Sequence, residues 1–200
     1  MIRLAFLASN NGSSLRAIVA AIEAGDLTAE PVLAVSNKKG APALDFASAH
    51  GIATKVIPTL PDADAADARL AMALTETRIN LVILSGYLRK LGPRTLATFK
   101  GRILNIHPAL LPAHGGAGMY GRRVHEAVIA AGDTRSGASV HLVDDEYDHG
   151  RVIAQVEFVV LPGETSESLE ARVMAAEPKL LVDTLARIAR GELRLEATQS

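Results

Sequence analysis

The sequence contains no cysteine and no long uninterrupted hydrophobic stretch. Without cysteine the chain can form neither disulfides nor thiolate metal sites, and it has no cysteine nucleophile. No segment reaches the roughly 18 consecutive apolar residues of a membrane-spanning helix. The apolar run at the N-terminus, about five residues long, is too short for the core of a signal peptide. We therefore expect a cytoplasmic protein that has no membrane partner.

The chain also lacks an excess of charge of either sign. Its 21 lysine and arginine residues are balanced by 22 aspartate and glutamate residues, which gives a formal net charge of −1. Electrostatic binding of nucleic acid needs a positive field, so we expect no nucleic-acid partner. A local phosphate site stays open, because a few backbone amides can form one without net charge. With 200 residues, 48% hydrophobic and 22% charged, the composition is that of a folded globular protein.

Apolar segments alternate with segments of helical periodicity along the chain. We predict strands at residues 2–8, 31–36, 53–57, 80–84, 103–106, 138–143 and 152–160. We predict helices from residue 15 to a stop at Gly25, and at 42–50, 65–78, 122–131 and 166–193, where Pro178 should kink or split the last helix. This order predicts an α/β fold, a Rossmann-like, doubly wound, mostly parallel sheet with helices on both faces. Without repeats or linkers, we expect one domain over residues 1–200.

Polar residues that follow predicted strands form the candidate site, because ligands of open α/β sheets bind outside the carboxyl ends of the strands. Residues 12–14 (GSS) follow the first strand and precede a helix. Free amides and the helix dipole would suit a phosphate there, and capping of the helix by a serine is the alternative. Residues 88–91 follow the strand at 80–84 and form either an apolar pocket wall or an ordinary loop.

Asn105 and His107 lie at the end of the strand predicted at 103–106. In an extended segment their side chains point to the same side, where the amide could hold an oxyanion and the imidazole could shuttle a proton. A purely structural histidine is the alternative. Asp148, in the acidic loop 144–150, would raise the pKa of a nearby imidazole. The alternative is that this loop is only a solvated acidic segment. We discount a calcium site, because the loop lacks the ligand spacing of a calcium loop.

Four further histidines give no metal-binding pattern. We interpret His141 as a core residue and His114, His125 and His149 as surface residues. Because no HxxxH or HExxH pair occurs, we expect no metal site.

Residues 105–112 (NIHPALLP), followed by 139–143 (SVHLV) and 148–150 (DHG), resemble the formyltransferase family that uses 10-formyltetrahydrofolate. The likeness covers most of the chain. It implies a transferase that moves a formyl group from 10-formyltetrahydrofolate to the amine of glycinamide ribonucleotide in purine biosynthesis. It also implies small-molecule partners, no metal, and a monomer or homodimer.

The resemblance further implies a role for each matching residue. Asn105 would hydrogen-bond the formyl oxygen, His107 would act as general acid and base, and Asp148 would raise the pKa of His107. The acceptor-binding set would be Gly12, Ser13, Ser14, Met174 and Glu177. The folate-binding set would be Leu88, Arg89, Lys90, Leu91, Asn105, Asp144, Asp145, Glu146, Tyr147 and Asp148. Ser14 and Met174 depart from the usual family pattern, so the acceptor could be a different phosphorylated amine.

Three other functions remain as alternatives. The first is a 10-formyltetrahydrofolate hydrolase, which resembles the deformylases and normally carries an extra N-terminal domain. The second is the catalytic part of a methionyl-tRNA formyltransferase, which needs a further C-terminal domain and a basic surface. A chain that starts at its first strand and ends after one helix leads us to expect neither. The third is a binding module without catalysis, which the combination of Asn105, His107 and Asp148 disfavours.

Overall fold

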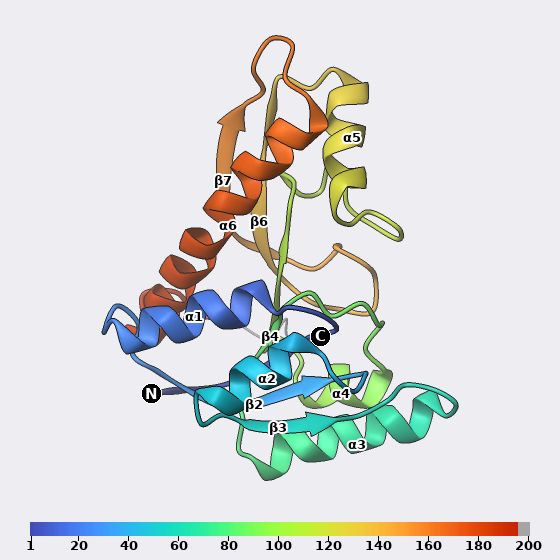
Figure 1. Ribbon diagram of the computed structural model, residues 1–200, viewed down its shortest axis with the longest axis vertical. Helices are drawn as coiled ribbons and strands as arrows, with labels where there is room; N and C mark the ends of the chain where they lie inside the picture. Colours follow the sequence, from blue (N-terminus) through green and yellow to red (C-terminus); the bar gives the residue numbers. More distant parts are fainter. Residues whose placement is uncertain (196–200) are drawn as a thin grey trace.

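The computed structural model describes residues 1–195, which form one seven-stranded sheet with helices on both faces (Figure 1). The strands are β1 (Ile2–Leu7), β2 (Ala29–Ser36), β3 (Ala53–Val56), β4 (Leu81–Leu84), β5 (Ile103–His107), β6 (Arg135–Leu142) and β7 (Val152–Val159). The helices are α1 (Ser13–Glu23), α2 (Pro42–Ala49), α3 (Ala63–Glu76), α4 (Pro93–Thr98), α5 (Arg122–Ala131) and α6 (Ser166–Ala189). The predicted single domain extends to residue 200 and stays a prediction, since residues 196–200 lie outside the described part.

The strand order is β3-β2-β1-β4-β5-β6-β7. Neighbours from β3 to β5 pair in parallel, whereas β6 pairs antiparallel with both β5 and β7. The prediction of a Rossmann-like, mostly parallel α/β fold is therefore confirmed. The chain order along the sheet reverses between β1 and β4, and such a switch point leaves a crevice at the carboxyl ends of the strands.

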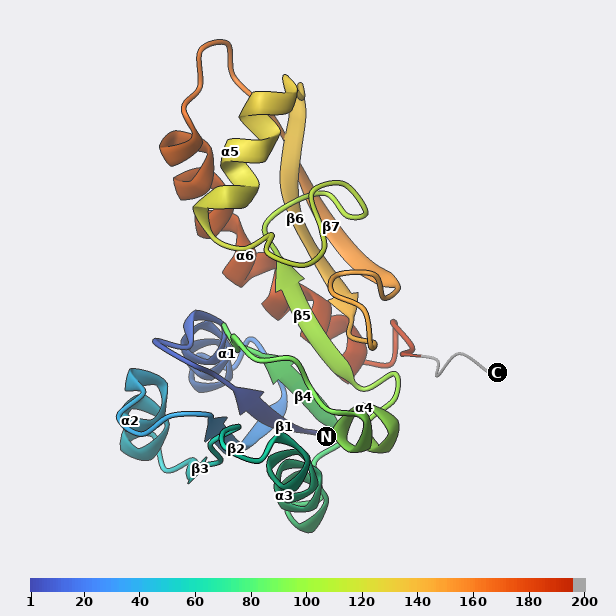
Figure 2. The ribbon, with the colours of Figure 1, turned by 90° about the vertical axis from the view of Figure 1, so that its right-hand side faces the viewer.

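The parallel part of the sheet is covered by helices on both of its faces (Figure 2). Leu4 and Phe6 of β1 pack with α1, α2 and the second half of α6. Ala5 and Leu7 of the same strand pack with α3 and with the segment around α4. Because successive side chains of β1 enter opposite cores, the strand is apolar from Leu4 to Leu7 and shows no alternation there.

The antiparallel end has a small core of its own. Val128 of α5 and Ala138 of β6 pack there with Leu169 and Val173 of α6. Figures 1 and 2 show α6 running from this end along the sheet to α1. The helix is continuous past Pro178, so the expectation of a split is wrong. Buried leucines beyond the proline keep the second half of α6 packed although one backbone hydrogen bond is lost.

Helix α4 was not predicted, because six residues are too few to show a helical period. Its start depends on a residue of another helix. The buried carboxylate of Asp67, in α3, accepts hydrogen bonds from the backbone amides of Arg94, at 2.8 Å, and Thr95, at 3.1 Å.

None of the helices in residues 1–195 has the length and hydrophobicity that a membrane-spanning helix needs.

Candidate active site

The loops that follow β1 and β4 are joined by two buried serines at the switch point. The Ser9 hydroxyl accepts a hydrogen bond from the Leu88 amide at 2.8 Å. The Ser85 hydroxyl accepts one from the Leu15 amide, in α1, at 2.9 Å. The predicted phosphate turn and the predicted folate loop are therefore neighbours, although about 75 residues separate them in the chain.

The first predicted site element, residues 12–14, has the geometry of an anion-binding turn. Gly12 caps α1 with φ of 68°, so neither Ser13 nor Ser14 occupies the cap position, and the alternative that one of them caps the helix is wrong. In the first turn, the Leu15 amide donates to the Ser85 hydroxyl. A Cβ at Gly12 would lie 2.8 Å from the Cβ of Ala43, so only glycine fits. The amides of Ser13 and Ser14, at the start of α1, stay available to an anion.

The three predicted catalytic residues come together at the end of β5. Nδ1 of His107 lies 3.4 Å from Oδ2 of Asp148, which belongs to the loop after β6. Nε2 of His141 lies 3.5 Å from Oδ1 of the same carboxylate and 3.1 Å from Nδ2 of Asn105. Asp148 has a left-handed backbone with φ of 58°, a conformation that is uncommon for non-glycine residues.

His141 is the member of this cluster that sequence reasoning missed. It is buried, as predicted for a core residue, but its ring contacts both Asn105 and Asp148. The register of β5 and β6 places it directly opposite Asn105. That register depends on strand pairing, for which the sequence carries no local signal.

The turn after His107 is held by Ser139, one strand away. The buried Ser139 hydroxyl donates to the Ala109 carbonyl at 2.6 Å and accepts from the Leu111 amide at 3.0 Å. Gln155 of β7 donates to the Leu111 carbonyl at 3.0 Å. The segment with the sequence NIHPALLP therefore leaves the sheet along a defined path, which fixes the position of the imidazole.

The contacts of His107 define which of its ring nitrogens is free. Nε2 lies 2.8 Å from the carbonyl oxygen of His114. A carbonyl can only accept, so Nε2 carries the proton and Nδ1 of the neutral ring is unprotonated. Nδ1 faces Asp148 and is the nitrogen that can take up and return a proton.

The pKa of His107 is lower than usual, because burial of the ring outweighs every other influence. Asp148 and the His114 carbonyl raise it, and His141 lowers it. The predicted effect of Asp148 on the pKa of His107 thus has the right sign, but burial of the ring outweighs it. Burial alone would raise the pKa of Asp148, yet its contacts with His141, His107 and the Gly116 amide hold it below the usual range.

The predictions for the other histidines hold only in part. His149 is exposed, as expected. His114 is largely buried, with its Nε2 2.6 Å from Oδ2 of Asp133. His125 is 1% exposed, so its prediction as a surface residue is wrong. It lies on the buried face of α5.

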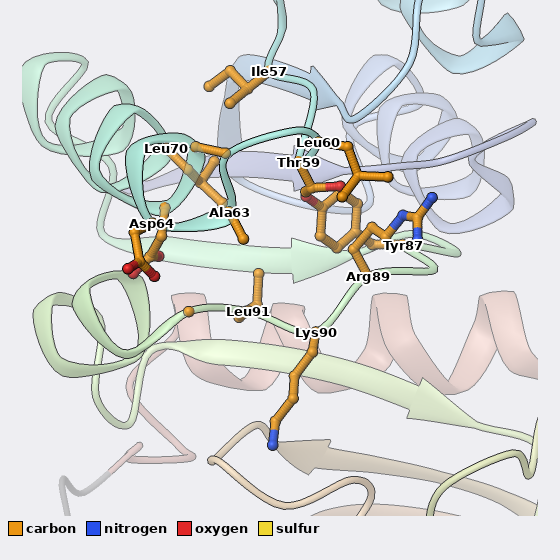
Figure 3. Close-up of a pocket in the computed structure, with 13 residues that line it drawn as sticks. Ile57, Thr59, Leu60, Ala63, Asp64, Leu70, Tyr87, Arg89, Lys90 and Leu91 are labelled. Atoms are coloured by element: carbon orange, nitrogen blue, oxygen red, sulfur yellow. The ribbon is translucent and has the colours of Figure 1, made fainter.

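The predicted folate loop lines a cavity of about 260 Å³ (Figure 3). Arg89, Lys90 and Leu91 contribute to its wall, together with residues of α3 and of the segment before it. Leu88 is not part of this wall and is 57% exposed, so of the two leucines only Leu91 has the predicted place.

The second predicted folate wall, residues 144–148, lies next to the first. Figure 3 shows Lys90 extending away from the other labelled side chains of the cavity. Its Nζ lies 5.9 Å from the ring centroid of Tyr147. Asp144 accepts a hydrogen bond from the Glu146 amide at 3.0 Å, and Asp145 and Glu146 are exposed. Of residues 144–148, Asp148 alone contacts His107 and His141 in the cluster at the end of β5.

The predicted acceptor residues on α6 differ in their environment. Met174 is 56% exposed. Glu177 is partly buried, and burial raises its pKa to about 7. Helix α6 packs against α1, the helix that starts at the phosphate turn. This packing is compatible with one acceptor site formed by both helices.

The model of the formyl transferase family matches residues 2–185. The chain therefore belongs to the formyl transferase family. The phosphoribosylglycinamide formyltransferase of Arabidopsis thaliana chloroplasts is 38% identical over 189 residues, which cover 93% of this chain and 65% of the relative. The chain thus spans less than two thirds of that relative.

Solved structures agree with this assignment. The crystal structure of glycinamide ribonucleotide transformylase 1 from Symbiobacterium toebii has 32% sequence identity and a TM-score of 0.88, covering 98% of this chain and 91% of its own. A formyltetrahydrofolate deformylase from Pseudomonas syringae has a TM-score of 0.84 at 21% identity, covering 95% of this chain and 62% of its own. The second likeness shows a common fold alone.

Proposed function

We propose that this protein transfers the formyl group of 10-formyltetrahydrofolate to the amine of glycinamide ribonucleotide, a step of purine biosynthesis. The observation that carries the proposal is the cluster at the end of β5. It joins the amide of Asn105, the unprotonated Nδ1 of His107 and the carboxylate of Asp148. The names of the relatives at 38% and 32% identity support formyl transfer to glycinamide ribonucleotide.

Asn105 has the role of stabilising the oxygen of the transferred group. When the amine attacks the formyl carbon, negative charge develops on that oxygen, and an N–H donor aimed at it lowers the barrier. The Asn105 amide directs one N–H toward Nε2 of His141 and has a second N–H for the substrate. His141 therefore sets the orientation of the amide.

His107 has the role of moving the proton. The attacking amine must lose a proton and the leaving folate nitrogen must gain one, and Nδ1 of a neutral imidazole can do both in turn. Asp148 stabilises the imidazolium between these two transfers, since its charge raises the pKa of His107. The lowered net pKa keeps the ring ready to accept a proton at neutral pH. The reaction needs no metal and no covalent enzyme intermediate.

The substrates are assigned to the two sides of this cluster. The folate would lie along residues 88–91 and 144–148, whose walls Lys90 and Tyr147 connect. The phosphate of the acceptor would bind the first turn of α1 at residues 12–14, and Glu177 would contact its ribose. A cytoplasmic location and a monomer or homodimer remain predictions.

The decisive experiment follows the ultraviolet absorbance of 10-formyltetrahydrofolate with the protein, with and without glycinamide ribonucleotide. Turnover that requires the acceptor supports the transferase. Turnover without the acceptor would identify the hydrolase, and no turnover at all would contradict the proposal.

His107→Ala should lower the rate by about 100-fold or more, because the proton shuttle is gone. The matched control is His50→Ala. It removes a partly exposed histidine at the end of α2, which is paired with Glu23 at 2.7 Å. The control should keep the parent rate. Activity of the His107 variant within tenfold of the parent would contradict the assigned role.

A further inference from the structure

The loop between β5 and α5 holds both catalytic side chains through its backbone. The carbonyl of His114 accepts from Nε2 of His107 at 2.8 Å. Two residues later, the amide of Gly116 donates to Oδ2 of Asp148 at 3.1 Å. A Cβ at Gly115, between them, would lie 3.1 Å from the Cβ of Asp148. The position of this loop therefore determines which partners His107 and Asp148 have.

The side chain of His114 ties this loop to the end of α5. Its Nε2 lies 2.6 Å from Oδ2 of Asp133, with 18% of the imidazole and 40% of the carboxylate exposed. Asp133 follows Gly132, which ends α5, and its amide donates to the carbonyl of Val128 at 3.3 Å. The backbone that carries the Asp133 carboxylate is therefore hydrogen-bonded to the end of α5.

The backbone at His114 has a conformation that is favoured by support from surrounding contacts. Its φ is 54°, in the left-handed region that a residue with a Cβ rarely adopts. A strained conformation persists when surrounding contacts enforce it. The link to Asp133 supplies that enforcement on the residue whose carbonyl faces His107.

We propose that the pair His114–Asp133 is a positioning element for the reaction. It holds the His114 carbonyl on the Nε2–H of His107 and so keeps Nδ1 unprotonated and turned toward Asp148. Its effect on the rate rests on the proposed function, whereas its effect on the ring of His107 does not. Neither His114 nor Asp133 is a catalytic residue, because neither contacts the reacting atoms in this assignment.

Loss of the pair should change the titration of His107 in a defined direction. Without the pair the His114 carbonyl leaves Nε2, and the imidazolium loses an acceptor that raises its pKa. The imidazole of His114 itself lowers the pKa of His107, but less than the His114 carbonyl raises it, so the loss of the carbonyl decides the direction. Asp148, which raises the pKa, and His141, which lowers it, stay in place. His125 of α5 also interacts with His107. The pKa should therefore fall further, and the neutral ring should no longer hold a single tautomer.

The test compares His114→Phe and Asp133→Ala, which remove either partner, with His114→Gln, which keeps an N–H donor of similar reach. The control is His50→Phe, because His50 also pairs with a carboxylate at 2.7 Å. Nitrogen-15 NMR of the imidazoles, assigned with His107→Ala, gives the tautomer and the pKa of His107 without any substrate. We expect a lower pKa and mixed tautomers in the first two variants, values near the parent for His114→Gln, and no change in the control.

The rates of the same variants should follow the NMR result. His114→Phe and Asp133→Ala should lower kcat by roughly tenfold, because a displaced proton carrier slows transfer. KM for the acceptor should stay within twofold, and the double variant should lose no more than either single variant. Asp133→Ala leaves the loop sequence intact, so it tests the proposal even where His114→Phe fails to fold.

An unchanged tautomer and pKa of His107 in Asp133→Ala would overturn the positioning role. The positioning role would also be overturned if the rate loss of the double variant equalled the product of the two single losses. A parent enzyme without formyl transfer would refute the proposed function, and the NMR comparison would still decide this inference.

Discussion

At the scale of single residues, burial sets the protonation states of the groups at the site. It lowers the pKa of His107 and thereby favours the neutral ring that a proton carrier needs. Asp148 is ionised, because its contacts lower its pKa by more than burial raises it. Within residues 1–195, no such contact offsets the burial of Glu177, so its pKa rises from 4.5 to about 7. Two carboxylates of one site region thus differ in charge near neutral pH.

The raised pKa of Glu177 predicts a stability that depends on pH. The folded protein binds this proton more tightly than the unfolded chain does, so the free energy of unfolding falls as the pH rises from about 4.5 to about 7. Glu177→Gln removes this loss and should stabilise the protein at pH 8 by up to about 3 kcal/mol. Urea unfolding at pH 5 and pH 8 measures the difference.

At pH 5 the same substitution should have a much smaller effect. The control is Glu126→Gln on α5, which replaces an exposed glutamate. A stabilisation equal at both pH values would show that Glu177 does not titrate as described.

At the scale of elements, the smallest helix is held by one carboxylate. Asp67 is 7% exposed, and its Oδ1 also accepts from the hydroxyl of Thr95 at 2.6 Å. A Cβ at Gly92, just before α4, would lie 2.4 Å from Oδ2 of Asp67. The helix start and the carboxylate are thus packed in direct contact, and the cavity wall that ends at Gly92 depends on this contact.

Asp67→Ala should lower the free energy of unfolding by about 2–4 kcal/mol, because it leaves the buried amide of Thr95 and the partly buried amide of Arg94 without their acceptor and removes the shorter hydrogen bond of the Thr95 hydroxyl. Urea unfolding measures this loss. Asp64→Ala, an exposed position in the same helix, should change stability by less than about 0.5 kcal/mol. KM for 10-formyltetrahydrofolate should rise in the first variant. A loss below about 1 kcal/mol would contradict the role of Asp67 as the anchor of α4.

At the scale of the whole molecule, the site is assembled from the two parts of the sheet. Asn105 and His107 end the last parallel strand, while His141 and Asp148 belong to the antiparallel end and its loop. Helix α6 contributes to the core of both parts, with Leu169 in one and Leu185 in the other. The helix therefore couples the stability of the two parts.

Leu169→Ala should cost about 2–5 kcal/mol, because the side chain is fully buried in the small core. Owing to the coupling through α6, the whole protein should still unfold in one transition. The chain has three tyrosines and no tryptophan, so Tyr87 fluorescence can report the parallel part once Tyr120 and Tyr147 are changed to Phe. Circular dichroism reports the helices. Two separate transitions would show that the small core folds independently.

The sequence by itself determined the architecture and the common side of Asn105 and His107 at the end of β5. Unbroken apolar runs predict buried parallel strands, because both faces of such strands must be covered. The alternation of Asn105 and His107 predicts a common side for both groups, because side chains of a strand alternate. These inferences depend on residues that are close together in the chain.

Only the tertiary structure decided the place of His141 and His114 and the existence of α4. It also decided the direction of the pKa shift of His107. In each case the determining contact joins residues far apart in the chain: His141 with Asn105, His114 with Asp133, and Asp67 with Thr95. A pKa also depends on the balance between burial and neighbouring charges, and both are set by packing in three dimensions.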